Sequence, residues 1–317
     1  MEMLASGFGF VDVHYRETPG IIATAVLQGA SGVTLVDPGP AASLGGLRAG
    51  LEGNGIRTAD VEAILLTHIH LDHAGATGTL VRENPRIRVF VHERGAKHVV
   101  DPTRLLESAR RLYGDEMGAL WGEVEAVPPA NVTSLEGGET LTVGDRELRV
   151  LYTPGHASHH VSYYDAASRV ALVGDVAGVR LPSSSIALPP TPPPDVDLEA
   201  WRTSTAGIRA WQPDTLFLTH FGPFTAPGPH LADMLDRLER LAVSTRRLLD
   251  EPAANVEGAS EPPEAGAADE ARQQRFVGEL RRELRRHVDE ATLQRYALAV
   301  PFEHCWLGLA RYWRKRA

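Results

Sequence analysis

The chain has 317 residues, of which 43% are hydrophobic and 23% are charged, and this is the composition of an ordinary globular protein. A chain of this length can form one large α/β domain with a smaller appendage. Its formal net charge of −9 argues against a general nucleic-acid-binding protein, which needs a basic surface.

Cysteine content and hydropathy indicate the cellular compartment. The single cysteine, Cys305, excludes a disulfide bond within the chain. No stretch approaches the roughly 20 apolar residues that span a membrane. The first residues lack the basic and apolar regions of a secretory signal. We therefore expect a cytoplasmic location, with no membrane partner and no nucleic-acid partner.

The first part of the chain is predicted to form β-strands followed by a helix. Asp37 ends the third strand in a turn that contains two prolines. Leucines at helical spacing predict a helix over 44–51, which ends at the Gly-Asn-Gly of 53–55. The three strands are expected at 9–14, 21–28 and 33–36.

A dense cluster of metal-ligating side chains follows the next predicted strand, at 63–66. His68 and His70 are two residues apart, so they point to the same side of an extended segment. Asp72 and His73 follow once the chain has turned. Imidazole and carboxylate groups are ligands of zinc and similar divalent metals. The spacing therefore predicts a metal site in a loop, with room for two ions. The cluster consists of His68, His70, Asp72 and His73.

The elements after this cluster carry histidines that we interpret as packing or surface residues. The pattern predicts a helix over 75–84, a strand over 87–92 and mostly helical structure over 94–127. His92 and His98 lie in these elements, and neither belongs to a cluster.

In the second half of the chain, three predicted strands again end at side chains that can bind a metal. Since His68 also follows a strand, four strands in total end in this way, and the set is stronger evidence than any single histidine. The three new side chains are His156, Asp175 and His220. Strands are expected in this half at 132–135, 141–143, 147–152, 161–164, 170–173 and 215–218.

A proline-rich loop at 181–197 is expected to form one wall of a substrate cleft. Asp197 is predicted to cap a helix over 198–211. After His220 the patterns predict a helix over 231–249, an acidic linker at 251–270 and further helices over 271–317. We therefore divide the chain into a catalytic domain, 1–230, and a helical C-terminal extension, 231–317.

The last segment, 271–317, is basic, with eleven Lys or Arg residues against five Asp or Glu. Two interpretations stay open: a solvated helical face, or arginines that bind an anionic small-molecule substrate. A homo-oligomer is also left open. The candidate arginines are Arg281, Arg282, Arg285 and Arg286.

The motif His-x-His-x-Asp-His at 68–73, completed by the three later side chains, resembles the ligand set of the metallo-β-lactamase fold hydrolases. The resemblance implies an α/β fold, an αββα sandwich. It also implies that Asp175 bridges two metal ions. The first ion would be held by His68, His70 and His156, and the second by Asp72, His73 and His220.

The same resemblance places further residues around the ions. Asp37 would lie beneath them and orient a ligand histidine, although a simple turn residue is the alternative. His159 and His160 would be supporting or surface groups, with His159 nearer the site. Zinc suits a mixed histidine and carboxylate site, and iron and manganese remain alternatives.

The activity implied by this resemblance is that of a dinuclear metal-dependent hydrolase that uses a metal-bridging hydroxide, with Asp72 as a catalytic residue. A thioesterase similar to glyoxalase II fits best, because the ligand set is complete and the C-terminal extension is helical. The glutathione-binding residues of that branch have no match in 221–317. A lactonase, a phosphodiesterase or a mono-iron persulfide dioxygenase of the same fold are the alternatives. Lactonases of this fold carry a tyrosine three residues after the bridging aspartate, where this chain has Gly178. The net negative charge of the chain disfavours a phosphodiesterase.

Overall fold

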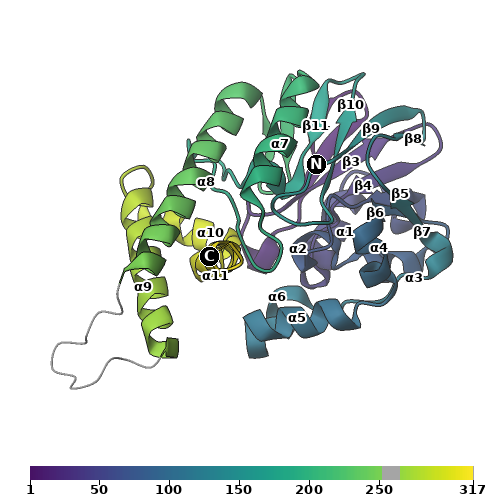
Figure 1. The fold of residues 1–317 in the computed structure, drawn as a ribbon. Helices are drawn as coiled ribbons and strands as arrows, with labels where there is room; N and C mark the ends of the chain where they lie inside the picture. The colour runs from purple at the N-terminus through teal and green to yellow at the C-terminus, as the bar shows by residue number, and fades with distance from the viewer. Residues whose placement is uncertain (252–264, 317) are drawn as a thin grey trace.

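The computed structural model describes residues 1–251 and 265–316. Two β-sheets pack face to face, and helices cover their outer surfaces (Figure 1). The expected αββα sandwich is therefore confirmed. Further helices, α8 to α11, follow the sandwich at the C-terminal end of the chain.

The first sheet has seven strands in chain order, antiparallel from β1 to β4 and parallel from β4 to β7. Strand β5 is central and buried on both faces, which explains its continuous apolar run. The strands are β1 (Glu2–Ala5), β2 (Phe8–Asp12), β3 (Ala23–Gln28), β4 (Val33–Val36), β5 (Val61–Leu65), β6 (Arg88–His92) and β7 (Val132–Leu135).

The second sheet has six strands in the order β13-β12-β11-β10-β9-β8. Only β11 and β12 are parallel, because α7 connects them across the outer face. The strands are β8 (Thr140–Val143), β9 (Arg146–Tyr152), β10 (Val161–Asp165), β11 (Val170–Leu172), β12 (Thr215–Leu218) and β13 (Gly222–Phe224).

Side chains from both sheets meet in an apolar core between them. The rings of Phe8 and Phe10, on β2, lie 6.1 and 5.8 Å from the ring of Phe217 on β12. Tyr163 on β10 donates a hydrogen bond of 2.8 Å to the carbonyl of Leu66, just after β5. These contacts fix the ends of β5 and of the second sheet beside each other.

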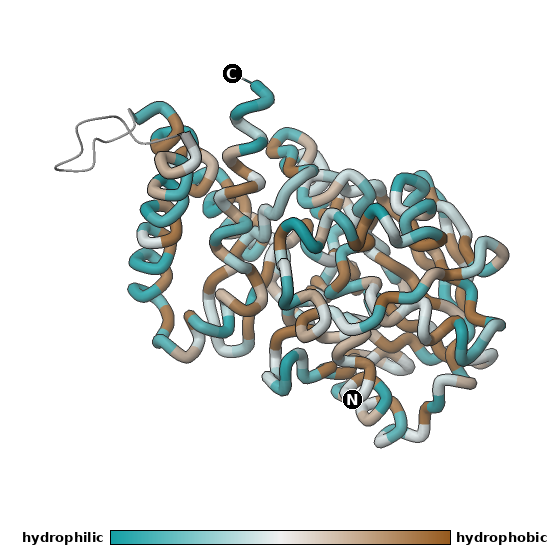
Figure 2. The backbone as a smooth tube through the Cα atoms, turned by 90° about the horizontal axis from the view of Figure 1, so that it is seen from below, coloured by the Kyte–Doolittle hydropathy of each residue, from teal (hydrophilic) through white to brown (hydrophobic). Residues whose placement is uncertain are grey.

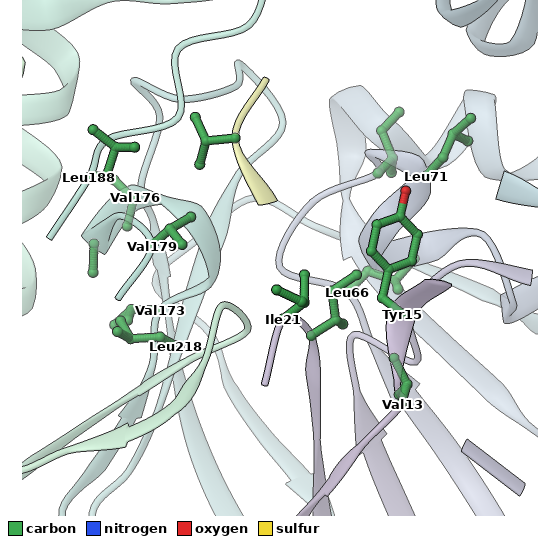
Figure 3. Close-up of a cluster of buried hydrophobic side chains, with 14 of the residues drawn as sticks. Val13, Tyr15, Ile21, Leu66, Leu71, Val173, Val176, Val179, Leu188 and Leu218 are labelled. Atoms are coloured by element: carbon green, nitrogen blue, oxygen red, sulfur yellow. The ribbon is translucent and has the colours of Figure 1, made fainter. Parts of the chain in front are cut away.

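The outer helices pack on the other faces of the sheets. Helix α1 contacts β2, α4 contacts β6 and β7, and α7 contacts β9. Figure 3 shows apolar side chains from both halves beside the strand ends, among them Leu66, Val173 and Leu218. The helices before the second sheet are α1 (Leu44–Glu52), α2 (Leu71–Ala74), α3 (Thr77–Glu83), α4 (Glu93–Val100), α5 (Thr103–Tyr113) and α6 (Met117–Trp121).

One sequence-based prediction for this part was wrong, because the segment with Asp72 and His73 is not a loop but the short helix α2. The predicted helix over 75–84 is confirmed as α3, which begins at Thr77. The region 94–127 is mostly helical, as expected, and 122–127 is its non-helical end. The predicted N-cap is confirmed, since Asp197 accepts a hydrogen bond of 3.0 Å from the backbone of Ala200.

The C-terminal helices share a core with the rest of the chain. Phe276, Tyr296 and Trp306 are fully buried in the same apolar cluster as residues of the first sheet. Figure 2 shows hydrophobic stretches along these helices, alternating with hydrophilic ones. The helices are α7 (Leu198–Ala210), α8 (Pro227–Asp250), α9 (Ala265–Leu284), α10 (Glu290–Ala299) and α11 (Phe302–Arg314).

The boundaries near the predicted extension differ from the expected ones. Helix α8 begins at Pro227, so the expected division at 230 falls inside it. Helix α9 begins at Ala265, before position 271, and the remainder of the predicted linker, 252–264, lies outside the described residues. The division into two domains stays a prediction. Over the described residues, no helix is both long enough and apolar enough to span a bilayer.

Candidate metal centre

All seven predicted ligands come together where strands of the two sheets end. His68 and His70 follow β5, and helix α2 carries the next two ligands. From the second sheet, His156 follows β9, Asp175 lies in a short 3-10 turn after β11, and His220 follows β12. Because these ends lie side by side, side chains 152 positions apart in the sequence (220 − 68) share one site.

Three imidazoles form the first group of ligands. His70 Nδ1 lies 3.0 Å from His68 Nε2 and 2.9 Å from His156 Nε2. The three ligand atoms lie within 4.8 Å of one another. This group matches the three residues expected to hold the first ion.

Asp72, His73 and His220 form the second group. His220 Nε2 lies 3.3 Å from Asp72 Oδ2, and His73 Nε2 lies 3.8 Å from the same oxygen. Asp175 stands between the two groups, with Oδ1 3.2 Å from His73 Nε2 and Oδ2 3.5 Å from His156 Nε2. The arrangement is the one that a bridging carboxylate requires, and the role of Asp175 as the bridge stays a prediction.

The ring nitrogens that face away from the centre are fixed by hydrogen bonds. His156 Nδ1 donates to the carbonyl of Pro190 at 2.8 Å, and His220 Nδ1 donates to the carbonyl of Ile21 at 2.9 Å. A ring that donates through Nδ1 keeps the lone pair of Nε2 free for a metal. The backbone thus sets the tautomer of both rings.

Asp37 connects three of the strand ends beneath the site, and its expected role in orienting a ligand histidine is confirmed. Its carboxylate accepts hydrogen bonds from His73 Nδ1 at 2.8 Å and from the hydroxyl of Thr219 at 2.7 Å. It also accepts from the backbone and the hydroxyl of Thr67, at 2.8 and 2.7 Å. Since the hydroxyl of Thr67 donates to Asp37, it is free to accept from His68 Nδ1 at 3.1 Å. One buried carboxylate therefore orients two ligand rings.

His160, rather than His159, makes the contact that supports the predicted bridge. Its Nε2 accepts a hydrogen bond of 3.2 Å from the backbone of Asp175, and its Nδ1 lies 2.8 Å from the hydroxyl of Thr153. Gly174 has φ of 47° and leaves no room for a side chain, because a Cβ there would lie 2.5 Å from Thr67 Oγ1. The sequence favoured His159 as the histidine near the site, and it does line the cavity, while His160 makes the contact with Asp175.

The other histidines lie where packing explains them, or on the cavity wall. His159 stacks beside His68 with ring centres 6.1 Å apart, and it lines the cavity. His92 is buried, stacks on Tyr152 at 4.4 Å and caps α4, which confirms the packing interpretation. His98 also lines the cavity.

Burial and neighbouring charges shift the pKa values of the centre in opposite directions. Burial, together with the neighbouring imidazoles, lowers the pKa of His68 well below its usual value. Burial alone would also lower the pKa of His73, but the carboxylates of Asp175, Asp72 and Asp37 raise it well above the usual value. Burial raises the pKa of Asp72, but His73 and His220 lower it to about 2. The first group therefore holds neutral imidazoles. In the second group the carboxylates raise the pKa of His73 and His220 and so favour positive charge at these rings, a charge that a bound divalent cation would supply in place of the protons.

Unsatisfied polar atoms support the fit of metal ions. Three ligand atoms are buried and make no hydrogen bond: His73 Nε2, His220 Nε2 and Asp175 Oδ1. Buried polar atoms normally have a partner, because leaving one unpaired is costly. A cation bound between them would satisfy all three.

A cavity of about 580 Å³ opens above the centre. His70, Asp72, His156 and Asp175 lie at its base. Pro190 to Asp195 form part of its wall, as expected for the proline-rich loop, and Ala299 to Pro301 add a second part. A neighbouring cavity of about 450 Å³ also contains Asp72 and is lined by Tyr15, Tyr113 and His220.

The arginines that the sequence suggested for an anionic substrate do not line these cavities. Arg281 lies over the ring of Phe302 at 5.2 Å, and Arg285 forms an ion pair with Glu290 at 3.0 Å. Arg281 and Arg285 therefore make contacts within the helical extension, and a role of the four arginines in binding an anionic substrate stays a prediction.

Comparisons with known proteins agree with this geometry. The family model of the metallo-beta-lactamase superfamily matches residues 18–220. The chain is 37% identical over 114 residues to the probable metallo-hydrolase YqgX of Bacillus subtilis, covering 36% of this chain and 48% of that protein. It is 29% identical over 117 residues to a hydroxyacylglutathione hydrolase of Synechococcus, covering 37% of this chain and 35% of that enzyme. The matches thus span about half and about a third of these relatives.

A solved structure extends the similarity over nearly the whole chain. The metallo-beta-lactamase family protein TTHA1429 from Thermus thermophilus superposes with a TM-score of 0.66 at 25% identity, covering 98% of this chain and 94% of that one. The fold and the buried histidine and aspartate groups define a metal-dependent hydrolase. The chain belongs to the metallo-beta-lactamase superfamily.

We expect the protein to bind two divalent ions per chain at saturation, because the two ligand groups and the shared carboxylate exceed the four ligands of one closed zinc site. Elemental analysis of metal-replete, desalted protein measures this number. The matched control is a His68→Ala/His220→Ala variant, which loses one ligand from each group. A stoichiometry of one in the unaltered protein would contradict the two-ion assignment.

Proposed function

We propose that the protein hydrolyses a small, anionic thioester with the help of two divalent ions. Zinc is the proposed metal. The observation that carries this proposal is the pair of ligand groups joined by Asp175 at the base of the 580 Å³ cavity. The hydroxyacylglutathione hydrolase relative supports a thioester as the bond cleaved. The low cysteine content supports the cytoplasm as the proposed location.

The residues have distinct roles in this reaction. When bound, the two cations supply Lewis-acid activation of water and of the scissile carbonyl. Asp72 has 21% of its side chain exposed, and its low pKa keeps it ionised at neutral pH, so it can accept a hydrogen bond from the attacking water and orient it. The oxygen of this water forms a bond to the carbonyl carbon and the C–S bond breaks. One proton of the water passes to the leaving sulfur, and the other is released to solvent. The products are a carboxylate and a thiol.

A substrate panel tests the proposal. The metal-replete protein is assayed with a thioester, a lactone and a phosphodiester, alongside chelator-treated protein and the Asp72→Asn variant. We expect the thioester to show a kcat/KM at least roughly tenfold above the others, and chelation to abolish it. Preferential cleavage of the lactone or the phosphodiester would replace the proposal with that activity. One iron atom per chain together with oxygen consumption would instead identify a persulfide dioxygenase.

A further inference from the structure

The cavity wall beyond the metal centre is basic, although the chain as a whole carries a net charge of −9. Arg94 and Lys97 reach this wall from α4, and Arg104 and Arg111 reach it from α5. His98 lies among them. In an acidic protein, a wall with four cations concentrates anions at the site through its local field.

Over residues 1–251 and 265–316, these four cations have no charged partner in direct contact, although Arg94 lies over the ring of Tyr152 at 5.5 Å. In the part of the chain that the structure describes, none of them forms an ion pair, whereas nearby Arg82 pairs with Glu125 at 3.1 Å. Of the described residues that line the cavity outside the metal centre, only Asp195 carries a carboxylate, and it accepts a hydrogen bond of 2.5 Å from the hydroxyl of Ser158. Among the described residues that line the cavity beyond the metal centre, one carboxylate therefore stands against four cations, and outside the lining Asp101 lies near Arg104.

The number and spacing of the cations indicate how much negative charge a matching ligand carries. Arg104 and Arg111 are seven residues apart on one face of α5, which is about 10 Å along a helix. A phosphate monoester carries a charge of about −1.5 to −2 at neutral pH, so two such groups would balance the four cations. Guanidinium groups also match phosphate geometry.

We propose that this basic wall, formed by Arg94, Lys97, Arg104 and Arg111, binds a phosphate-bearing arm of the substrate, so that thioesters of phosphorylated thiols are preferred over those of uncharged thiols. The inference rests on the proposed thioester hydrolysis and specifies its substrate class. The opposite wall, built from the prolines at 190–194 and from 299–301, offers no basic side chain, so the charged arm lies along α4 and α5.

A series of substrates with one acyl group and one thiol end tests this preference. Acetyl-pantetheine, acetyl-phosphopantetheine and acetyl-coenzyme A differ in their phosphate groups and share the scissile bond. We expect a KM at least roughly tenfold lower for acetyl-coenzyme A than for acetyl-pantetheine, with the advantage shrinking as salt is added.

The Arg104→Gln/Arg111→Gln variant should reduce this selectivity about ten- to a hundredfold. Arg110→Gln is the matched control, because Arg110 is an exposed residue of α5 that does not line the cavity, and it should keep the selectivity.

Binding of an unreactive coenzyme A analogue that lacks the thiol, measured by calorimetry on the metal-replete protein, does not depend on turnover. We expect affinity to fall at least roughly tenfold in the double variant and to stay unchanged in Arg110→Gln. Equal affinity of the unaltered protein and the double variant for the analogue would overturn the inference about the basic wall. Equal KM values across the three hydrolysed thioesters would do the same, and in both cases the proposed thioester hydrolysis would stand. Failure to hydrolyse any of the three thioesters would overturn the proposed function, while loss of analogue binding in the double variant would still support the basic wall as a polyanion site.

Discussion

Replacing Asp175 with alanine is expected to lower kcat/KM by about 10³-fold or more, whereas replacing His159 with alanine should lower it by no more than about tenfold. The two oxygens of Asp175 approach the two ligand groups separately, at 3.2 Å from His73 and 3.5 Å from His156. Removing this carboxylate takes a ligand from both proposed ions and leaves the imidazoles with less compensating negative charge. Lewis-acid stabilisation of the transition state is worth several kcal/mol, and about 4 kcal/mol corresponds to 10³ in rate.

His159 provides the comparison because it lies beside the same centre without belonging to either ligand group. Its ring stacks near His68, and its Nδ1 accepts only a long hydrogen bond, 3.5 Å, from the backbone of Ile69. Outer residues of a metal site typically contribute about ten- to a hundredfold, and this weak contact belongs at the lower end. The experiment measures kcat/KM and metal content for both variants, with thermal melting as a check on folding. Equal losses of activity in the two variants would show that Asp175 is not the bridge.

Replacing Asp37 with asparagine is expected to weaken metal binding about ten- to a hundredfold and to destabilise the metal-free protein by about 2 kcal/mol or more. The carboxylate is fully buried and accepts four hydrogen bonds, two of them from Thr67 and the others from His73 and Thr219. Asparagine has the same shape, but one of its two polar atoms is a donor. It would therefore place a donor against buried donors and would no longer fix the ring of His73.

The matched control is Asp165→Asn. Asp165 is also buried, and it accepts hydrogen bonds from Arg146 at 2.6 Å and from Ser168 at 2.8 Å, but it lies at the end of β10 that is remote from the ligands. Denaturant unfolding of the metal-free proteins and competition titrations with a chelator measure the two effects. Asp165→Asn should lower stability and leave metal affinity unchanged. If Asp37→Asn showed the same pattern, Asp37 would be a structural residue of the turn and would have no role in orienting the ligands.

Asp37 also shows how the fold supports the site at a local cost. It adopts a left-handed backbone conformation, with φ of 52°, which aspartate tolerates better than most residues. This conformation lies directly after β4, where the carboxylate meets the ends of β5 and β12. A strained residue held by four hydrogen bonds at a strand junction is typical of a functional centre.

The sequence by itself predicted the candidate ligands and most of the strands. His68, Asp175 and His220 could be predicted because each follows an apolar run, and an apolar run that stops at a polar residue is a local pattern. The close spacing of the histidines at 68–73 predicted the metal chemistry for the same reason. Local periodicity was less successful where helices are short, as for α2 at Leu71–Ala74, because four residues hardly exceed one helical turn.

Only the tertiary structure decided what surrounds these ligands. Thr219 meets Asp37 across 182 positions of the sequence, and His160 meets Asp175 because β9, β10 and β11 are neighbours in one sheet. The basic wall comes from α4 and α5, whereas the sequence had suggested the arginines of the C-terminal helices. These contacts depend on the pairing of strands and the packing of helices over long sequence separations. Amino-acid spacing records only which face a side chain takes within its own element, so it cannot specify which distant element that face will meet.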